Sequence, residues 1–338
     1  MAFKNVGKAA LGTVSSGKGG FITMDAAGIA SGEAFLVSEL EKRDTLVRTP
    51  LNSFTYGRDL PIRVGGGWDE FVSAMSVSYG VTGGSDNLGH APGANGVPMV
   101  QANFDKGLFK THVVSAGTRV MWVDMQRGNL TGRNMDSLLR DGLRLAYDKH
   151  LDQNAYVGFT NYGTTGLVNN ANVTATTVAT GAGGYTTFVT KTPDEILADI
   201  NGAILDAWEA AEYDLDAVPN HIIMPYEQYN YLATTKVSSV AEKTILTFLL
   251  ENNVATQNGS DLFIGATAWC KGAGTGSTDR MVVYCNKERY VAMDELVPLT
   301  RAMTTPNTQD FCYDTAYAAN VSEVELFYSQ TITYADGI

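Results

Sequence analysis

The chain has 338 residues, of which 24 are Lys or Arg and 36 are Asp or Glu, so its formal net charge at pH 7 is −12. Because clustered Lys and Arg residues drive binding to phosphates, this charge argues against an extensive nucleic-acid-binding surface. No window reaches the roughly 18 consecutive apolar residues of a membrane span, and the start lacks the apolar core of a signal peptide. We therefore expect a protein that contacts no membrane and stays in the cytosol where it is made.

A glycine-rich segment, LGTVSSGKGG (residues 11–20), lies close to the start. Its Gly12–Lys18 part approaches the G-x-x-x-x-G-K-[ST] pattern that binds nucleotide phosphates, but Gly19 stands where that pattern needs a hydroxyl. No buried strand precedes the segment and no helical pattern follows it, although such sites need both. An extended arm is the preferred interpretation, and a nucleotide-binding enzyme that uses Gly12–Lys18 stays open as a distant alternative.

The first half of the chain predicts an arm followed by a long β-hairpin. One helix-like segment, residues 32–47, precedes Pro50. Residues 69–81 and 107–125 are rich in β-branched and aromatic residues, which predicts two long strands. Between them, residues 82–98 (TGGSDNLGHAPGANGVP) are dense in Gly, Pro, Asn and Asp. A loop of this size is usually functional or disordered.

The second half of the chain mixes helices with strands. Apolar residues at helical spacing predict one long helix over residues 134–156. Thr192 and Glu195 are spaced as a capping box at the start of a second helix, and Ser239 and Glu242 repeat the spacing for a third. Strand patterns lie at residues 219–225, 261–270, 280–294 and 321–338. With 44% hydrophobic residues, the chain can bury a substantial core, and its fold class is α+β with two lobes.

Residue types that carry chemistry are sparse. Cys270, Cys285 and Cys312 lie far apart without a C-x-x-C pair, which predicts buried free thiols and neither a zinc site nor a disulfide framework. No His pair has metal-binding spacing, and no G-x-S-x-G nucleophile turn is present. His221 lies in an apolar segment and is expected to be a hydrogen-bonded core or edge residue. The sequence therefore predicts no catalytic residue, no metal ion and no cofactor.

The order of these segments resembles that of a known family. The segments are GLVNNANV after the long helix, then TPDEILADINGAI, IIMPYEQYNYL, EKTILTFLLENN and DRMVVY, and the closing YADGI. In order and spacing they are similar to the major capsid proteins of tailed bacteriophages, which have the HK97-like fold. The resemblance extends over nearly the whole chain from about Phe35.

This resemblance implies a division of the chain into the parts of that fold. Residues 1–57 would be the N-terminal arm, and residues 58–118 the extended loop, or E-loop. Residues 119–162, which contain the long spine helix, would form the peripheral domain together with residues 291–338. Residues 163–290 would form the axial domain.

The resemblance also implies a function, which is structural and not enzymatic. The protein would be a major capsid protein that self-assembles into pentamers and hexamers of an icosahedral shell around phage double-stranded DNA. Its partners would be further copies of itself, the packaged DNA through weak non-specific contacts, and portal and decoration proteins. Since the start has no long acidic helical segment, a separate scaffold protein is expected. The protein would reside in the virion after assembly in the cytoplasm of the host bacterium. An encapsulin-like nanocompartment shell, which shares the fold, is the alternative.

Two groups of residues are the expected contact sites under this resemblance. The first group consists of three basic residues before Met24, in a stretch without any acidic residue: Lys4, Lys8 and Lys18. They would face DNA in the shell interior. The second group consists of apolar residues of the hairpin: Met75, Val77, Tyr79, Val113 and Val114. They would contact other subunits. An isolated two-stranded hairpin is only marginally stable in water, so another surface must cover these side chains.

Overall fold

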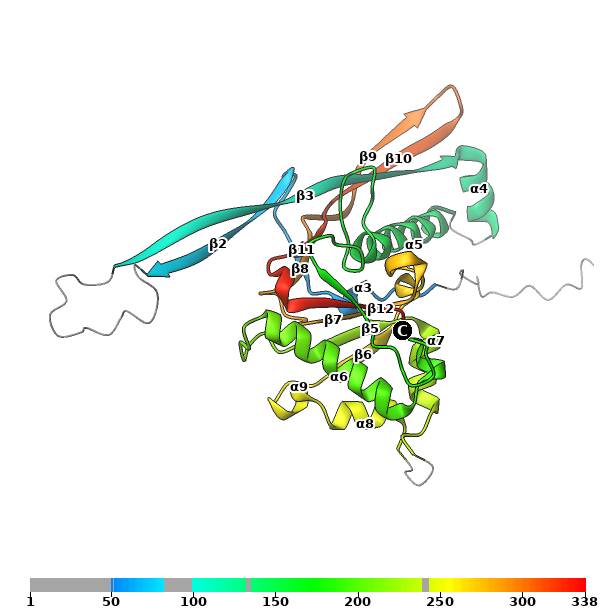
Figure 1. Ribbon diagram of the computed structural model, residues 1–338. Helices are drawn as coiled ribbons and strands as arrows, with labels where there is room; N and C mark the ends of the chain where they lie inside the picture. The colour runs from blue at the N-terminus through cyan, green and yellow to red at the C-terminus, as the bar shows by residue number, and fades with distance from the viewer. Residues whose placement is uncertain (1–49, 51, 82–98, 132–134, 239–242) are drawn as a thin grey trace, which may run out of the picture. The chain divides into compact units, whose positions relative to one another are not determined.

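A computed structural model of the chain describes residue 50 and residues 52–81, 99–131, 135–238 and 243–338 (Figure 1). The chain divides into two units, Met1–Ser53 and Phe54–Ile338, and the description that follows concerns the second. Three predicted features lie outside the described residues: the Gly12–Lys18 segment, the helix over residues 32–47 and the loop over residues 82–98.

A five-stranded sheet forms the centre of the second unit. Its order is β4 (Thr174–Thr177), β12 (Ile332–Asp336), β7 (Arg280–Tyr284), β5 (His221–Met224) and β6 (Phe263–Ala266). β7 is antiparallel to both of its neighbours, and the two outer pairs, β4 with β12 and β5 with β6, are parallel. Four of these strands confirm the strand patterns that the sequence predicts.

Helices pack against both faces of this sheet. One face carries α6 (Pro193–Ala210), α7 (Tyr226–Thr234), α8 (Ile245–Glu251) and α9 (Val254–Gln257), and the other carries α5 (Met135–Tyr156). β5 contributes side chains to both faces of the sheet, because successive side chains of a strand point to opposite faces. Ile222 and Ile223 are an example. Ile222 lies in the apolar cluster of the first group of helices, and Ile223 lies in the cluster that includes α5. The core is therefore two apolar layers with the sheet between them (Figure 1).

Two further sheets complete the unit. The smaller has the order β1 (Ile62–Val64), β8 (Val291–Glu295) and β11 (Val324–Leu326). The larger has the order β2 (Phe71–Val81), β3 (Val100–Met121), β10 (Cys312–Ser322) and β9 (Val297–Asn307). β3 pairs with β2 over its first half and with β10 over its second half, antiparallel in both cases. The predicted long hairpin is thus confirmed, as is the long helix, which begins at Met135.

One helix departs from the sequence prediction. The β-branched and aromatic residues of 107–125 predict a strand as far as Met125, but β3 ends at Met121 and α4 (Trp122–Thr131) follows. β10 begins at Cys312, which pairs with Met121, and beyond that pair the ladder continues only by one backbone hydrogen bond, from the Trp122 N–H to the Phe311 carbonyl (3.1 Å). Without a partner strand, the following residues form a helix. Short helical segments connect other elements: α3 (Tyr56–Asp59), η2 (Phe188–Thr190), η3 (Ala268–Cys270), η4 (Thr275–Ser277) and η5 (Ser329–Thr331).

The start of α6 confirms the predicted capping box. The Thr192 hydroxyl accepts a hydrogen bond from the Glu195 N–H (3.4 Å), and the Glu195 carboxylate accepts one from the Thr192 N–H (2.8 Å). Helix α8 has Thr244 as its N-cap. The capping pair predicted at Ser239 and Glu242 lies outside the described residues.

The predicted division into axial and peripheral domains stays a proposal. One pairing crosses it, because β12 lies in the range predicted as peripheral (291–338) but bonds to β4 and β7 of the range predicted as axial. The resemblance assigns the whole range 291–338 to one domain, and a strand pattern in the sequence does not specify which strands it pairs with.

The turn after α5 depends on glycine at one position. A side chain at Gly166 would collide with the main chain of Tyr156 and Val157, since the two backbones touch there. Val168 N–H and Leu167 N–H donate to carbonyls at the end of α5, which fixes this close approach (both 2.9 Å).

We predict that Gly166→Ala destabilises the fold by about 2–3 kcal/mol or more, because neither backbone can move away without losing these bonds. Gly142→Ala is the matched control. Gly142 lies within α5, and an added Cβ would meet open space there, so the substitution should stabilise the protein by up to about 1 kcal/mol. Urea unfolding of both variants measures the difference. Equal stabilities of the two variants would contradict the close backbone approach.

Candidate assembly surfaces

The β2–β3 hairpin has one apolar face and one polar face. Directly paired residues of an antiparallel ladder point to the same side, and the register pairs Val77 with Phe104 and Ser73 with Leu108. The side that carries these pairs holds Phe71, Met75, Val77, Tyr79, Val81, Val100, Phe104 and Leu108, together with Lys106 and Lys110. The other side holds mostly small or polar residues, among them Ser76, Ser78, Asn103 and Asp105.

The apolar face is uncovered in the part of the chain that the structure describes. Met75, Tyr79 and Phe104 are 73%, 75% and 70% exposed. Figure 1 shows the hairpin extending away from the other sheets and helices of its unit. Contiguous exposed apolar patches of this kind mark interaction surfaces on soluble proteins. This face of the hairpin is therefore a candidate binding surface, since no described residue of the unit covers it.

The predicted contact residues separate into two groups. Met75, Val77 and Tyr79 lie together on the apolar face of the hairpin. Val113 and Val114 lie in the half of β3 that pairs with β10, and as neighbours they point to opposite faces: Val113 is 57% exposed, whereas Val114 packs against the core of its own subunit. The position of Val114 therefore gives its predicted contact with other subunits no support.

Asp59 connects the central sheet with the segment that precedes the hairpin. Its buried carboxylate accepts hydrogen bonds from the Arg58 guanidinium (2.6 and 2.8 Å) and the Tyr156 hydroxyl, and it lies 3.1 Å from His221 Nε2. Burial alone would raise the pKa of Asp59, but the hydrogen bonds from His221, Arg58 and Tyr156 outweigh it and lower that pKa. The prediction of a hydrogen-bonded core position for His221 is confirmed.

Arg63 on β1 makes a second connection. Its Nε donates to Asp294 Oδ1 (2.6 Å), its Nη2 pairs with the buried Glu325, and its guanidinium lies 5.5 Å from the centre of the Phe327 ring. Burial and the charge of Asp294 raise the pKa of Glu325 to about 7, against the opposing effect of Arg63. These contacts link β1, β8 and β11 shortly before the chain enters β2.

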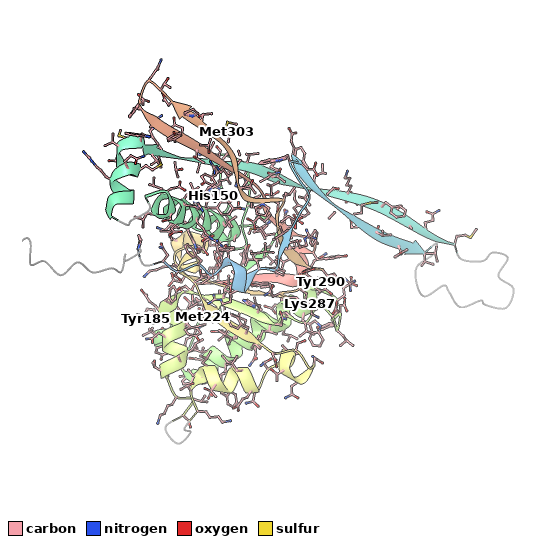
Figure 2. All side chains as sticks on the ribbon, turned by 180° about the vertical axis from the view of Figure 1, so that it is seen from behind. His150, Tyr185, Met224, Lys287, Tyr290 and Met303 are labelled. Atoms are coloured by element: carbon pink, nitrogen blue, oxygen red, sulfur yellow. The ribbon has the colours of Figure 1, made fainter. Side chains whose placement is uncertain are left out.

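A cluster of four rings connects β3 to α5. His112 Nε2 lies 2.9 Å from His150 Nε2, so one imidazole donates and the other accepts. Tyr162 stacks on His112 (centroids 4.8 Å apart) and Phe159 stacks on His150 (4.4 Å). His150, labelled in Figure 2, lies on α5, 38 residues from its partner in the chain. The cluster anchors β3 at the point where its pairing changes from β2 to β10.

Both histidines of this cluster are held neutral. Burial, followed by the charge of His150, lowers the pKa of His112 to about 4, and burial also lowers the pKa of His150. A proton on the accepting Nε2 would leave two N–H groups facing each other and would break the hydrogen bond of the pair. The anchor is therefore expected to weaken in acid.

The described residues offer no site for a bound metal, since no group of three or more His, Cys, Asp or Glu side chains is placed to bind one. Within the same residues, no helix is both long and apolar enough to cross a membrane. The three cysteines are buried and free, as predicted. Lys4, Lys8 and Lys18 lie outside the described part of the chain.

Comparison with known proteins identifies the family. A family model described as major capsid protein matches residues 89–338. The chain belongs to the major capsid protein family. No match was found among curated proteins. The match to this family favours a viral capsid protein over the encapsulin-like shell and over the nucleotide-binding enzyme, and it points to a structural role.

Solved structures show the fold of this capsid protein. The capsid of Myoviridae phage XM1 is similar with a TM-score of 0.72 and 16% identity, over 95% of this chain and 100% of that one. The capsid of a native GTA particle gives a TM-score of 0.62 and 12% identity, over 93% and 99% of the two chains. A chain of Microbacterium phage Oxtober96 gives 0.60 and 12%, over 90% and 97%. The predicted α+β fold of the HK97-like class is thereby confirmed.

We predict that the histidine pair makes the capsid protein less stable in acid. Both folded-state pKa values lie below the ordinary 6.5. The stabilisation that the neutral pair gives to the fold is therefore complete above pH 6.5 and is lost as the pH falls towards about 4. His112→Gln keeps a hydrogen bond donor for His150 but removes one titrating group.

Urea unfolding between pH 7.5 and 4.5 tests this prediction. The wild type should lose up to about 1.4 kcal/mol more per pH unit than His112→Gln. Carboxylates titrate in both proteins, so their contribution to the pH dependence cancels in the difference. The exposed Lys149→Gln on α5 is the control, and its pH profile should match that of the wild type. Identical pH profiles for wild type and His112→Gln would show that the pair does not titrate as described.

Proposed function

We propose that this capsid protein assembles into rings of five and six copies, which close into an icosahedral shell around double-stranded DNA. The observation that supports this proposal best is the uncovered apolar face of the β2–β3 hairpin. A two-stranded ribbon is marginal by itself, so a folded ribbon with an apolar face needs a second surface. In a ring, each copy places its hairpin on one neighbour and receives the hairpin of another. Such a contact joins two different surfaces, and its repetition around a rotation axis closes the ring.

The finer assignments belong to the same proposal. The arm would reach the shell interior, where Lys4, Lys8 and Lys18 would make weak, salt-dependent contacts with DNA. Residues 163–290 would form the axial domain, and residues 119–162 and 291–338 the peripheral domain. Assembly would take place in the cytoplasm of the bacterial host with a separate scaffold and a portal protein. Decoration proteins would bind the finished virion.

A charge placed on the apolar hairpin face should prevent assembly without unfolding the subunit. In Tyr79→Asp, the carboxylate would lie against an apolar surface in the shell without a partner, because the residue directly opposite on β3 is Ala102, and this is strongly unfavourable. In the unassembled subunit the same position is exposed, so its free energy of unfolding should change by less than about 1 kcal/mol.

The neighbouring Ser78→Asp is the matched control, since it adds the same charge to the polar face of the same strand, opposite the uncharged Asn103. Sedimentation velocity and negative-stain microscopy should find shells for the wild type and Ser78→Asp, and only single subunits or isolated rings for Tyr79→Asp. Normal shells of Tyr79→Asp would refute the role of this face.

A further inference from the structure

Strand β4 leaves one backbone edge of the central sheet open among the described residues. It is the first strand of that sheet, and β12 is its partner on the other side. The Val178 N–H, which directly follows β4, donates to the Asp336 carbonyl of β12 (3.0 Å). Alternate residues of a strand direct their backbone groups to opposite edges. Ala175 and Thr177 therefore direct their N–H and C=O groups outwards, and no described residue bonds to these groups.

This edge carries neither charges nor prolines, which often protect the exposed edge of a sheet against further pairing. The sequence of β4 is TATT, and all four residues are exposed. The strand is short, however, so an added strand would gain only a few backbone hydrogen bonds. A binding site at this edge consequently needs further contacts from its surroundings.

A groove of about 380 Å³ lies beside the edge and supplies such contacts, because it separates the sheet from α6. Thr176 of β4 and Thr333 and Ala335 of β12 line it on the sheet side, and Ala198 and Gly202 line it on the helix side. An added Cβ at Gly202 would meet open space. Side chains of an added strand that point towards α6 would therefore find room in this groove.

Helix α6 makes the groove acidic. All charged residues of this helix are acids: Asp194, Glu195, Asp199, Asp206 and Glu209. Glu195 accepts the hydrogen bonds of the capping box, and Asp199 is paired with the buried Lys191. Asp206, which lines the groove, has no ionic partner among the described residues. The charge of the groove therefore favours a basic occupant.

We propose that the β4 edge and this groove bind an extended basic segment of another polypeptide, which adds a strand to the central sheet. Backbone hydrogen bonds to Ala175 and Thr177 would supply affinity, and the groove would select the side chains, as in other strand additions. A Lys or Arg side chain would lay its apolar stem along Ala198 and Gly202 and place its charge beside Asp206. The site is independent of the hairpin face and of the proposed shell.

A second copy of this chain fits the same edge less well. Two-fold pairing of β4 with itself would bring no basic residue to the groove, because β4 contains none. It would also place two acidic α6 helices near each other, and like charges repel. The charge pattern therefore favours a basic partner over self-association at this edge.

Binding of a labelled synthetic peptide to the full-length protein tests the site. The probe is the hexapeptide KVKTKV with blocked ends, measured by fluorescence anisotropy, and EVETEV is the charge-reversed control. A third peptide has the sequence KVKTKV with every internal amide N-methylated, so it keeps the charges but cannot donate backbone hydrogen bonds. We expect saturable binding of KVKTKV, and at least roughly tenfold weaker binding of both other peptides. Equal binding of the N-methylated peptide would overturn strand addition.

Two pairs of variants locate the site on the protein. Gly202→Leu fills the groove and should melt at or above the wild-type temperature, since Leu favours a helix more than Gly does, yet it should weaken binding at least roughly tenfold. Gly142→Leu on α5 is its control and should bind normally. Asp206→Asn should weaken binding roughly threefold to fivefold, whereas Glu209→Gln, outside the groove lining, should not. Wild-type affinity in Gly202→Leu would overturn the proposed site.

Hydrogen–deuterium exchange identifies the edge that the peptide occupies. With saturating KVKTKV, the amides of Ala175 and Thr177 should exchange at least roughly tenfold more slowly than without it, while the Val178 amide, already bonded to β12, should not change. Bound peptide without this protection would overturn the pairing with β4. Slow exchange of both amides in the protein alone would show that a second copy covers the edge, and would overturn the assignment to a basic peptide.

Discussion

The second half of β3 is fixed to the body of its own subunit, whereas β2 is the only strand partner of the first half among the described residues. β10 lies beside the fixed half, and the four-ring cluster of His112, His150, Phe159 and Tyr162 joins it to α5. The contacts of Asp59 and Arg63 fix the chain shortly before it enters β2. The free half therefore projects from a fixed base, and its apolar face has no partner among the described residues of its unit. The assembly surfaces follow from this single arrangement.

Contacts of this kind are suited to a shell that must form without errors. In the proposed shell, each hairpin contact would be small, but every copy would take part in several, so the assembled structure would be far more stable than any one pair. Weak single contacts also allow wrongly placed copies to dissociate before closure. A subunit whose hairpin folded onto its own core would be more stable alone and could not form a ring.

Local patterns in the sequence predicted those elements whose causes are local. The capping box of Thr192 and Glu195 and the apolar spacing of the long helix depend on neighbours within a few residues, and both were confirmed. The apolar positions Met75, Val77 and Tyr79 are visible in β2 alone. Phe104 and Leu108 were missed because they join the same face only through the register with β2.

Other features depend on contacts between distant residues, which no local pattern contains. The pair of His112 and His150 has no recognisable spacing, since one residue lies on a strand and the other on a helix. The end of β3 at Met121 is set by where β10 begins, and the position of β12 is set by β4 and β7. Such features require the folded arrangement before they can be inferred.

The central claim is that the hairpin completes its structure on a neighbouring copy. Electron cryomicroscopy of purified wild-type protein tests it most directly. The account predicts closed shells built of five- and six-membered rings, in which β2 and the first half of β3 lie on the adjacent subunit. Single subunits or compact small oligomers, in which the hairpin folds back over its own sheets, would contradict it.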